Sequence, residues 1–212
     1  MKKLISFSYL AVCLLYVTAC NENSTQLSSN NNADIEQVKQ DQISVSFDYP
    51  IFDTLGDLAT GADFILKGSV ESSSEKLIDI YLDPEGDTEE ENPGGDPGDT
   101  IFPYLVSDFK VTEVYYGDVE VGEILPIKQF GGEMDGMNFV SEDIVFLNED
   151  EEYVVFLSTF DDSPAVLTNY TQGLYEINNE VLIPVIDEEE IKLEISLYDL
   201  ESVDEIIEEY KN

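Results

Sequence analysis

Short runs of apolar residues separated by turn residues make up most of the chain from Asp63 onwards. The runs are rich in Val, Ile, Tyr and Phe, which favour strands over helices. Many short strands and few helices predict a mainly β protein, built as a small antiparallel β-barrel or a sandwich. The predicted strands cover residues 63–70, 106–116, 124–130, 153–157, 174–177, 181–185 and 191–197.

The alternation of apolar and polar residues changes phase once in the second run. It follows one side through Phe109 and Val111, then continues on the other side from Val114. One extra residue in a strand produces such a shift, so we expect a β-bulge near Glu113. Glycines punctuate the link to residues 124–130, which predicts a hairpin with a longer loop.

Later runs differ in how many of their faces are apolar. Residues 153–157 are apolar on both faces, which predicts a central strand that is covered on both sides. Asn178 and Asn179 tolerate positive φ and predict a second hairpin, whose returning strand contains Pro184 and should therefore lie at a sheet edge. Residues 191–197 alternate most regularly and predict a further strand.

Helical signals occur at both ends of this β-rich part. Thr54 is a suitable N-cap for a short N-terminal helix that ends near Gly61. Ser202 and Glu205 have the spacing of a capping box and predict a C-terminal helix packed on the barrel wall. The apolar residues of that helix are Val203, Ile206, Ile207 and Tyr210.

The N-terminus has the pattern of a secretory signal. Lys2 and Lys3 precede an almost uninterrupted apolar stretch, which is shorter than a bilayer-spanning helix. Residues 17–20, Val-Thr-Ala-Cys, resemble the lipobox of bacterial lipoproteins, in which the signal peptide is cut off before a lipid-modified cysteine. We therefore expect residues 1–19 to be the signal peptide and Cys20 to be the lipidation site.

Cysteine content agrees with this expectation. Cys13 lies in the predicted signal peptide, so the mature chain keeps only Cys20, which has no partner for an internal disulfide. A diacylglyceryl group on its sulfur carries two acyl chains, which would hold the protein stably at the outer face of the cell membrane. Residues 20–42 are rich in Asn, Ser and Gln and predict a disordered, lipidated tether; residues 43–212 then form a single β-rich domain.

Charge and amino-acid composition exclude several classes of function. The net charge is −38, and removal of the two lysines of the signal peptide makes it −40. Such a field repels nucleic acid, so we expect no nucleic-acid partner. The chain has no histidine, arginine or tryptophan, which excludes imidazole-based catalytic triads and bidentate arginine clamps. We therefore expect no enzymatic activity and no catalytic residues.

An acidic insertion is predicted at residues 83–100. Its alternating acids Asp83, Glu85 and Asp87 are weak candidates for a calcium site, because carboxylate oxygens are the ligands that calcium prefers. The spacing does not fit an EF-hand, since the sixth and twelfth positions counted from Asp83 are Thr88 and Gly94. The alternative is a solvated loop without a cofactor.

The strand residues also carry a family resemblance. The segments 62–70, 109–118, 131–133 and 153–157 resemble uncharacterised lipoproteins of Gram-positive bacteria. More distantly they are similar to netrin-like OB-fold barrels, the fold of the tissue inhibitors of metalloproteinases. The resemblance implies a five-stranded OB-like barrel and leaves the activity open. Those inhibitors chelate a protease metal with a free N-terminal cysteine, whereas Cys20 is expected to be acylated.

Three functional hypotheses follow from the sequence. The first is a non-enzymatic, lipid-anchored extracellular domain that binds a protein or an envelope polymer. The second is a calcium-responsive surface module that uses the acidic loop. The third is a hydrolase that acts on wall polysaccharide with a pair of carboxylates, a chemistry that requires no histidine.

Overall fold

Strands make up most of the regular structure in this protein. The computed structural model describes residues 41–80, 100–186 and 192–210, all of which belong to the compact unit Lys39–Asn212. The strands are β1 (Asp41–Ser44), β2 (Phe64–Asp79), β3 (Ile101–Tyr116), β4 (Ile124–Phe130), β5 (Gly132–Met134), β6 (Met137–Val140), β7 (Glu152–Phe160), β8 (Ser163–Leu167), β9 (Leu174–Asn178) and β10 (Val181–Pro184). The helices are α1 (Leu55–Thr60), α2 (Leu197–Glu201) and α3 (Val203–Tyr210).

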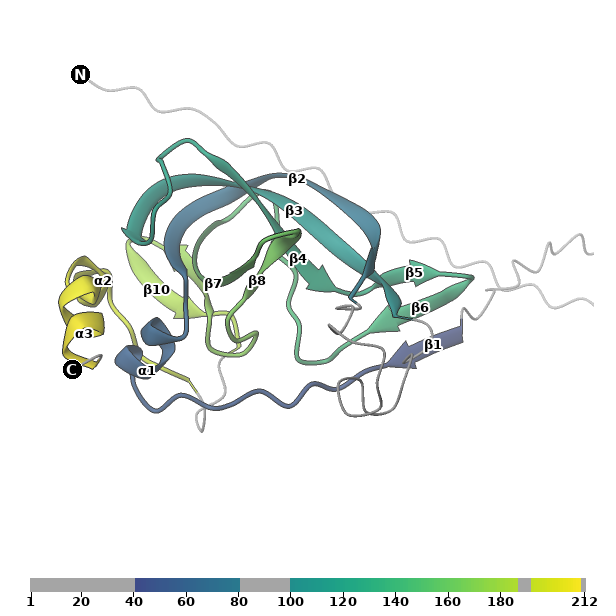
Figure 1. Ribbon diagram of the computed structural model, residues 1–212, viewed down its shortest axis with the longest axis horizontal. Helices are drawn as coiled ribbons and strands as arrows, with labels where there is room; N and C mark the ends of the chain where they lie inside the picture. Colours follow the sequence, from purple (N-terminus) through teal and green to yellow (C-terminus); the bar gives the residue numbers. More distant parts are fainter. Residues whose placement is uncertain (1–40, 81–99, 187–191, 211–212) are drawn as a thin grey trace, which may run out of the picture. The chain divides into compact units, whose positions relative to one another are not determined.

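Five strands close into a barrel-like ring in the order β7-β2-β3-β4-β8 and back to β7 (Figure 1). Neighbours are antiparallel except β4 and β8, which are parallel and meet at the single pair Ile127–Ala165. This confirms the mainly β fold class and a small OB-like ring that is partly open at one seam. The expectation that all strands are antiparallel is wrong at that seam. β8 is antiparallel to β7, and β7 runs opposite to β4, so β8 runs in the same direction as β4.

Two predicted features of the ring are confirmed by strand register. The pairing of β2 with β3 shifts between Ile65 and Leu66 and again between Lys67 and Gly68, on either side of the partner residue Glu113. Residues 153–157 are all buried, because β7 pairs with β2 along one edge and with β8 and β9 along the other. Each face of β7 is also covered by its own apolar cluster.

The first apolar cluster fills the ring, and the second lies between the ring and the helices. Leu66, Val155 and Leu157 point into the first cluster, whereas their neighbours Val154 and Phe156 point into the second. Val203 and Ile207 of α3 belong to that second cluster. The C-terminal helix therefore packs on the barrel wall, as the sequence predicts, and the helices gather at one end of the ring (Figure 1).

The predicted N-terminal helix cap and the predicted asparagine turn are both present in the structure. Thr54 caps α1 by accepting the Asp57 backbone N–H at 3.1 Å, which confirms the N-terminal helix. Asn179 and Glu180 have φ values of 51° and 67°, and β9 and β10 form the predicted hairpin. Pro184 lies in β10, which is the edge strand of the seven-stranded sheet.

Two predictions near the C-terminus are wrong. Residues 192–196 form no strand, and Leu197 opens helix α2. Ile195 is nevertheless buried in the second cluster, because alternation reports which side chains are buried and not whether a strand lies alongside. The capping box is formed by Ser196 and Asp199, whereas Ser202 ends α2 and donates its hydroxyl to the Asp199 carbonyl.

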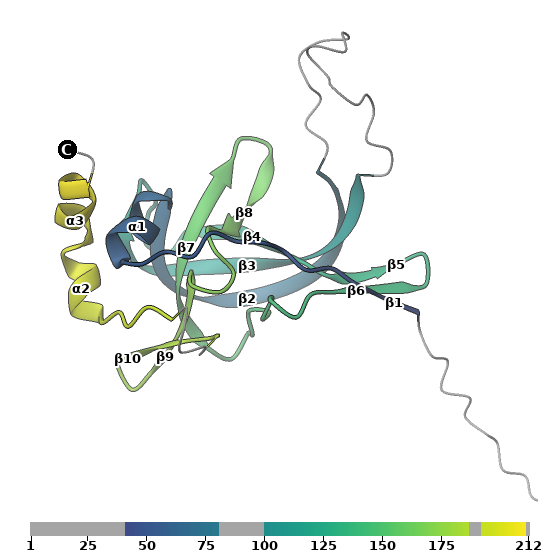
Figure 2. The same cartoon turned by 90° about the horizontal axis from the view of Figure 1, so that it is seen from below.

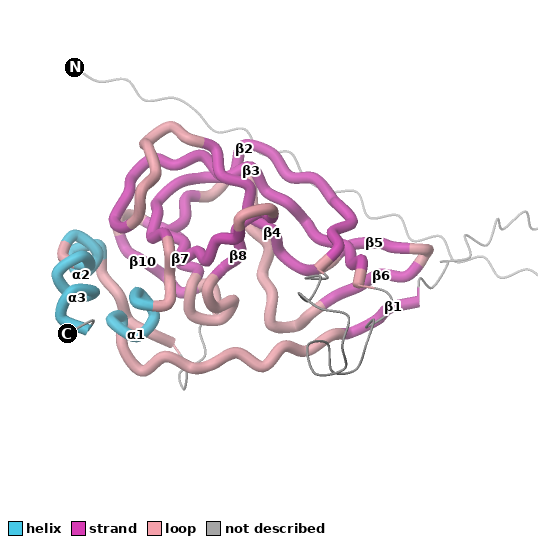
Figure 3. The backbone as a smooth tube through the Cα atoms, in the orientation of Figure 1, coloured by secondary structure: helices cyan, strands magenta, loops and turns pink. Residues whose placement is uncertain are grey.

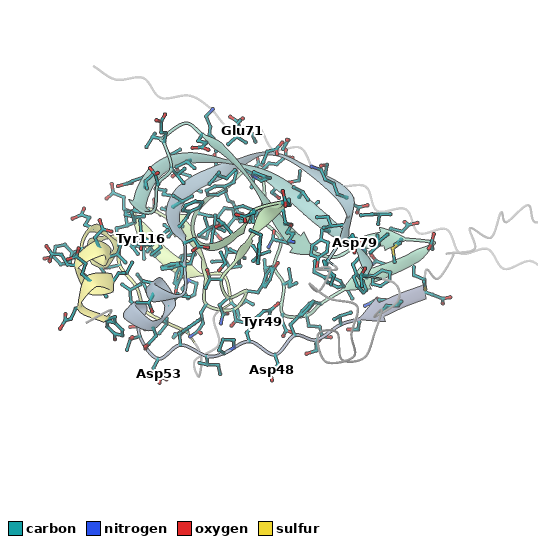
Figure 4. All side chains as sticks on the ribbon, in the orientation of Figure 1. Asp48, Tyr49, Asp53, Glu71, Asp79 and Tyr116 are labelled. Atoms are coloured by element: carbon teal, nitrogen blue, oxygen red, sulfur yellow. The ribbon has the colours of Figure 1, made fainter. Side chains whose placement is uncertain are left out.

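An irregular segment, residues 45–54, runs along the ring from β1 to α1; we call it the strap (Figure 3). Asp48 and Asp53 point away from the ring, while Tyr49 points toward it and packs on Tyr170 with ring centroids 5.5 Å apart (Figure 4). β1 itself begins at Asp41 and pairs in parallel with β6, so a strand precedes the predicted domain start at residue 43. None of the helices within the described ranges is long and apolar enough to cross a membrane.

Candidate functional site

The residues singled out from the sequence do not define a site in the described part of the chain. Cys20, Asp83, Glu85 and Asp87 all lie outside the described residues. Within residues 41–80, 100–186 and 192–210, no three potential metal ligands gather closely enough to hold an ion. The structure does describe a different feature beside the two ends of the acidic insertion.

This feature is a groove of about 1180 Å³, bounded by two walls that rise on the same side of the sheet (Figure 2). One wall is the far end of the β2–β3 arm, which we define as residues 72–79 of β2 paired with residues 101–108 of β3. The other wall is the turn between β7 and β8. The groove is lined by Lys76, Leu77, Ile78, Asp79, Ile80, Lys128, Thr159, Phe160, Asp161, Asp162, Ser163 and Pro164.

Lys128 contributes to the groove from strand β4 and is only 9% exposed. Its neighbours Ile127 and Gln129 are fully buried and point to the opposite face, since successive side chains of a strand alternate. Gln129 is held there by two backbone groups: its amide donates to the Val145 carbonyl at 2.8 Å and accepts the Leu147 N–H at 2.9 Å. The alternation therefore directs the Lys128 ammonium toward the groove.

The surroundings of this ammonium are unusual in so acidic a protein. Lys128 Nζ donates to the Ser163 hydroxyl at 2.6 Å and lies 5.5 Å from the ring centroids of both Tyr104 and Phe160. Aromatic faces attract a cation, but they do not neutralise it as a carboxylate does. Burial lowers the pKa of Lys128 below its ordinary value, and no carboxylate among the described residues forms an ion pair with it.

The rim of the groove combines exposed apolar side chains with acids. Ile80 and Phe160 are 46% and 52% exposed, and they stand on the two facing walls. Asp79 lies on the first wall and accepts the Thr100 hydroxyl at 2.5 Å, and two exposed aspartates, at positions 161 and 162, lie on the second. Apolar side chains that gather in water around a concavity are typical of an interaction site.

Sequence reasoning missed this groove, although one signal for it was visible. Lys128 is the single charged residue in the apolar run 124–130, which otherwise predicts a buried strand. A lysine in a buried strand needs specific partners for its ammonium, and in a chain with 9 lysines and 47 acids such a position is notable. The aromatic and serine partners come from distant strands and could not be identified from spacing.

The chemistry available in the groove favours binding over catalysis. An ammonium with apolar walls can hold an anion, and the Ser163 hydroxyl, 2.6 Å from Lys128 Nζ, would act as a nucleophile only if that amine first lost its proton. The rim aspartates do stand on both walls, as a carboxylate-pair hydrolase would need. They are exposed to solvent, however, and so lack the apolar enclosure in which a carboxyl group is kept as a general acid.

Comparisons with known proteins add no assignment to this geometry. No protein-family model matches the chain, and neither does any of the curated proteins with which it was compared. The proposals below therefore rest on the residues of this chain alone.

Proposed function

We propose that this protein is a lipid-anchored, non-enzymatic binding domain on the outer face of a bacterial cell membrane, and that it binds its partner in the groove. The observation that carries the proposal is the groove itself, with exposed apolar side chains on two facing walls above a buried ammonium. The partner is a protein or an envelope polymer, the two classes that such a position at the cell surface brings within reach.

The proposed anchor rests on the N-terminal sequence. Cys20 ends a lipobox-like tetrapeptide that follows a signal-like stretch, and the segment from there to residue 40 has the composition of a flexible linker. A flexible chain of that length has a root-mean-square span of roughly 25 Å, which would hold the barrel off the lipid surface. The groove would then be free to meet partners in the cell envelope.

The proposed binding role rests on the cost of leaving the groove uncovered. Ile80 and Phe160 expose apolar surface in the groove, and covering such a surface stabilises a complex by roughly 25 cal/mol per Å². Neither side chain is required to close the ring, because the apolar clusters of the fold do not include them. Their exposed surfaces therefore add nothing to either apolar cluster of the described protein.

Site-specific photo-cross-linking on intact cells tests this function. A benzophenone amino acid in place of Ile80 should capture a reproducible partner in the full-length protein, and Phe160→Ser should lower that capture about tenfold or more, as for an interface hot spot. The control places the same amino acid at Val121, which is 66% exposed in the loop between β3 and β4. Capture that is equal from both positions, or unchanged by Phe160→Ser, would refute the groove as the binding site.

The anchor is tested separately in the same cells. Cys20→Ala should release the protein from the membrane fraction, because the variant offers no sulfur for acylation. Incorporation of an alkyne-labelled fatty acid should be lost with it, while Cys13→Ala should retain the label. A Cys20→Ala protein that stays in the membrane fraction and keeps the label would contradict lipidation at this residue.

A further inference from the structure

Lys128 has more hydrogen-bonding capacity than the described protein uses. An ammonium carries three N–H donors, and the Ser163 hydroxyl accepts one of them at 2.6 Å. A buried charge is costly unless it is paired and hydrogen-bonded, and the two aromatic rings at 5.5 Å provide only part of that compensation. An anionic group that enters the groove would complete the pairing.

The rim restricts how many negative charges such a ligand can carry. Asp79, Asp161 and Asp162 line the same groove, and the described walls add only one further cation, Lys76. A second anionic group near the rim would meet these carboxylates, and like charges at close range repel strongly where water is partly excluded. The arrangement therefore suits one negative charge beside Lys128 and disfavours polyanions such as polymers of phosphate diesters.

The rest of the groove suits an extended, apolar ligand. Its volume of about 1180 Å³ exceeds the range of about 300–1,000 Å³ that is typical of small-molecule sites, so it can hold several residues of a chain. Apolar side chains stand on both walls at Ile80 and Phe160. These features match a ligand whose single charge lies at one end of an apolar body.

One edge of β2 adds a reason to expect a peptide. β2 pairs with β7 only over residues 64–69, so the stretch 72–78 is paired with β3 on one side and with no described strand on the other. Lys76, Leu77 and Ile78 of this stretch line the groove. An open strand edge recognises an extended peptide through backbone hydrogen bonds, which a polysaccharide cannot supply in the same pattern.

We infer that the groove recognises the C-terminal carboxylate of an extended, apolar peptide, with Lys128 as the residue that binds the carboxylate. This inference rests on the proposed function and names its ligand class. Lys128 supplies the charge, the Ser163 hydroxyl and the two aromatic rings orient its ammonium, and the rim aspartates exclude peptides with additional acids.

The inference is tested with two pools of N-acetylated hexapeptides of random apolar sequence, one with free C-terminal carboxylates and one with C-terminal amides. The full-length lipidated protein in detergent micelles should retain the free-carboxylate pool about tenfold to a hundredfold better, the range expected for a partly buried charge pair. Lys128→Met should abolish this preference. Lys110→Met is the matched control, since it removes the same charge from an exposed residue paired with Glu71 outside the groove.

The outcomes separate this inference from the proposed function. Equal retention of both pools, with retention lost in Phe160→Ser, would overturn carboxylate recognition and leave the groove as a binding site. Retention of neither pool would overturn the peptide assignment, while the photo-cross-linking experiment still decides the groove function. If Lys128→Met does not fold, Lys128→Gln preserves a donor for Ser163 without the charge, and a preference that persists in Lys128→Gln would refute the role of the ammonium.

Discussion

Raising the pH above 10 is expected to unfold this protein cooperatively, with a midpoint roughly between pH 10.5 and 12. The reason lies in three buried tyrosines, whose hydroxyl protons are all used. Tyr153 donates to the Glu151 carboxylate at 2.7 Å, Tyr170 to the Lys128 carbonyl at 3.1 Å and Tyr175 to the Leu193 carbonyl at 3.2 Å. Ionisation would remove each donor and place a negative oxygen against an acceptor.

Burial is the main cause that raises the pKa of all three tyrosines. The pKa of Tyr153 rises to about 12, and its hydrogen bond to Glu151 adds to the effect of burial. The pKa values of Tyr170 and Tyr175 rise further in the same direction. In the unfolded chain each hydroxyl ionises near its ordinary pKa of 10, so above that pH the folded state holds more protons than the unfolded state.

The free energy of unfolding therefore falls as the pH rises from about 10 to 12. Each tyrosine contributes a slope of about 1.4 kcal/mol per pH unit, and the three together about 4 kcal/mol per pH unit. Lys128 acts in the opposite direction only up to about pH 10.5, the ordinary pKa of a lysine, because above that pH the unfolded state has lost this proton too. A typical stability of about 5–15 kcal/mol would be lost over a few pH units.

Tyrosinate absorbance and circular dichroism measure this transition at fixed ionic strength. The chain has no tryptophan, so the near-ultraviolet absorbance change reports tyrosine alone. Tyr175→Phe should make the free energy of unfolding less steeply dependent on pH between 10 and 12. Tyr198→Phe is the control and should leave the slope unchanged, because Tyr198 is 77% exposed. Full ionisation of the tyrosines by pH 12 with an intact circular dichroism spectrum would contradict the prediction.

Asn169→Ala is expected to destabilise the protein by about 3–5 kcal/mol. Asn169 is fully buried, and its side-chain oxygen accepts the backbone N–H groups of Thr171 at 2.8 Å and Gln172 at 3.0 Å. Its amide nitrogen donates to the Pro50 carbonyl in the strap at 2.7 Å. Alanine would leave these backbone groups without their partner, at a cost of about 1–3 kcal/mol for each group that stays buried.

The same change should loosen the strap. Gln172 accepts the Phe52 N–H at 2.8 Å and donates to the Phe52 carbonyl at 2.9 Å, and Asn169 orients the turn that carries Gln172. Urea unfolding measures the stability, and hydrogen exchange at the Phe52 amide measures the strap. Asn178→Ala is the control, since Asn178 is exposed and should cost less than about 1 kcal/mol. Equal stability of the two variants would show that the buried network contributes little.

The sequence by itself determined the elements whose signals are local. The run 124–130 coincides with β4, Thr54 caps α1, and the asparagine turn before Val181 closes a hairpin. Each depends on the conformational preferences of a few neighbouring residues, which the chain carries whatever its partners are. The bulge near Glu113 was visible for the same reason, because a change of phase is itself a local pattern.

Long-range pairing decided the rest. The polar stretch from Ser72 to Lys76 gives no strand signal, yet it continues β2 because β3 lies alongside it, as the Ser73 and Ser107 hydroxyls 3.0 Å apart illustrate. Residues 192–196 show the reverse, since they alternate like a strand but form no ladder with any strand in the described part of the chain. Strand pairing depends on which distant segments meet, and alternation reports only burial.

The groove is the clearest product of tertiary structure. Lys128 comes from β4, Tyr104 from β3, and Phe160 and Ser163 from the ends of β7 and β8, so no spacing in the sequence brings them together. The sequence did determine the N-terminal pattern from which an anchor at Cys20 is expected. It also determined the acidity that makes a buried lysine without an acidic partner among the described residues unusual. Only closure of the ring placed that lysine between the two walls of the groove, because those walls come from segments that are far apart in the sequence and meet only in the folded protein.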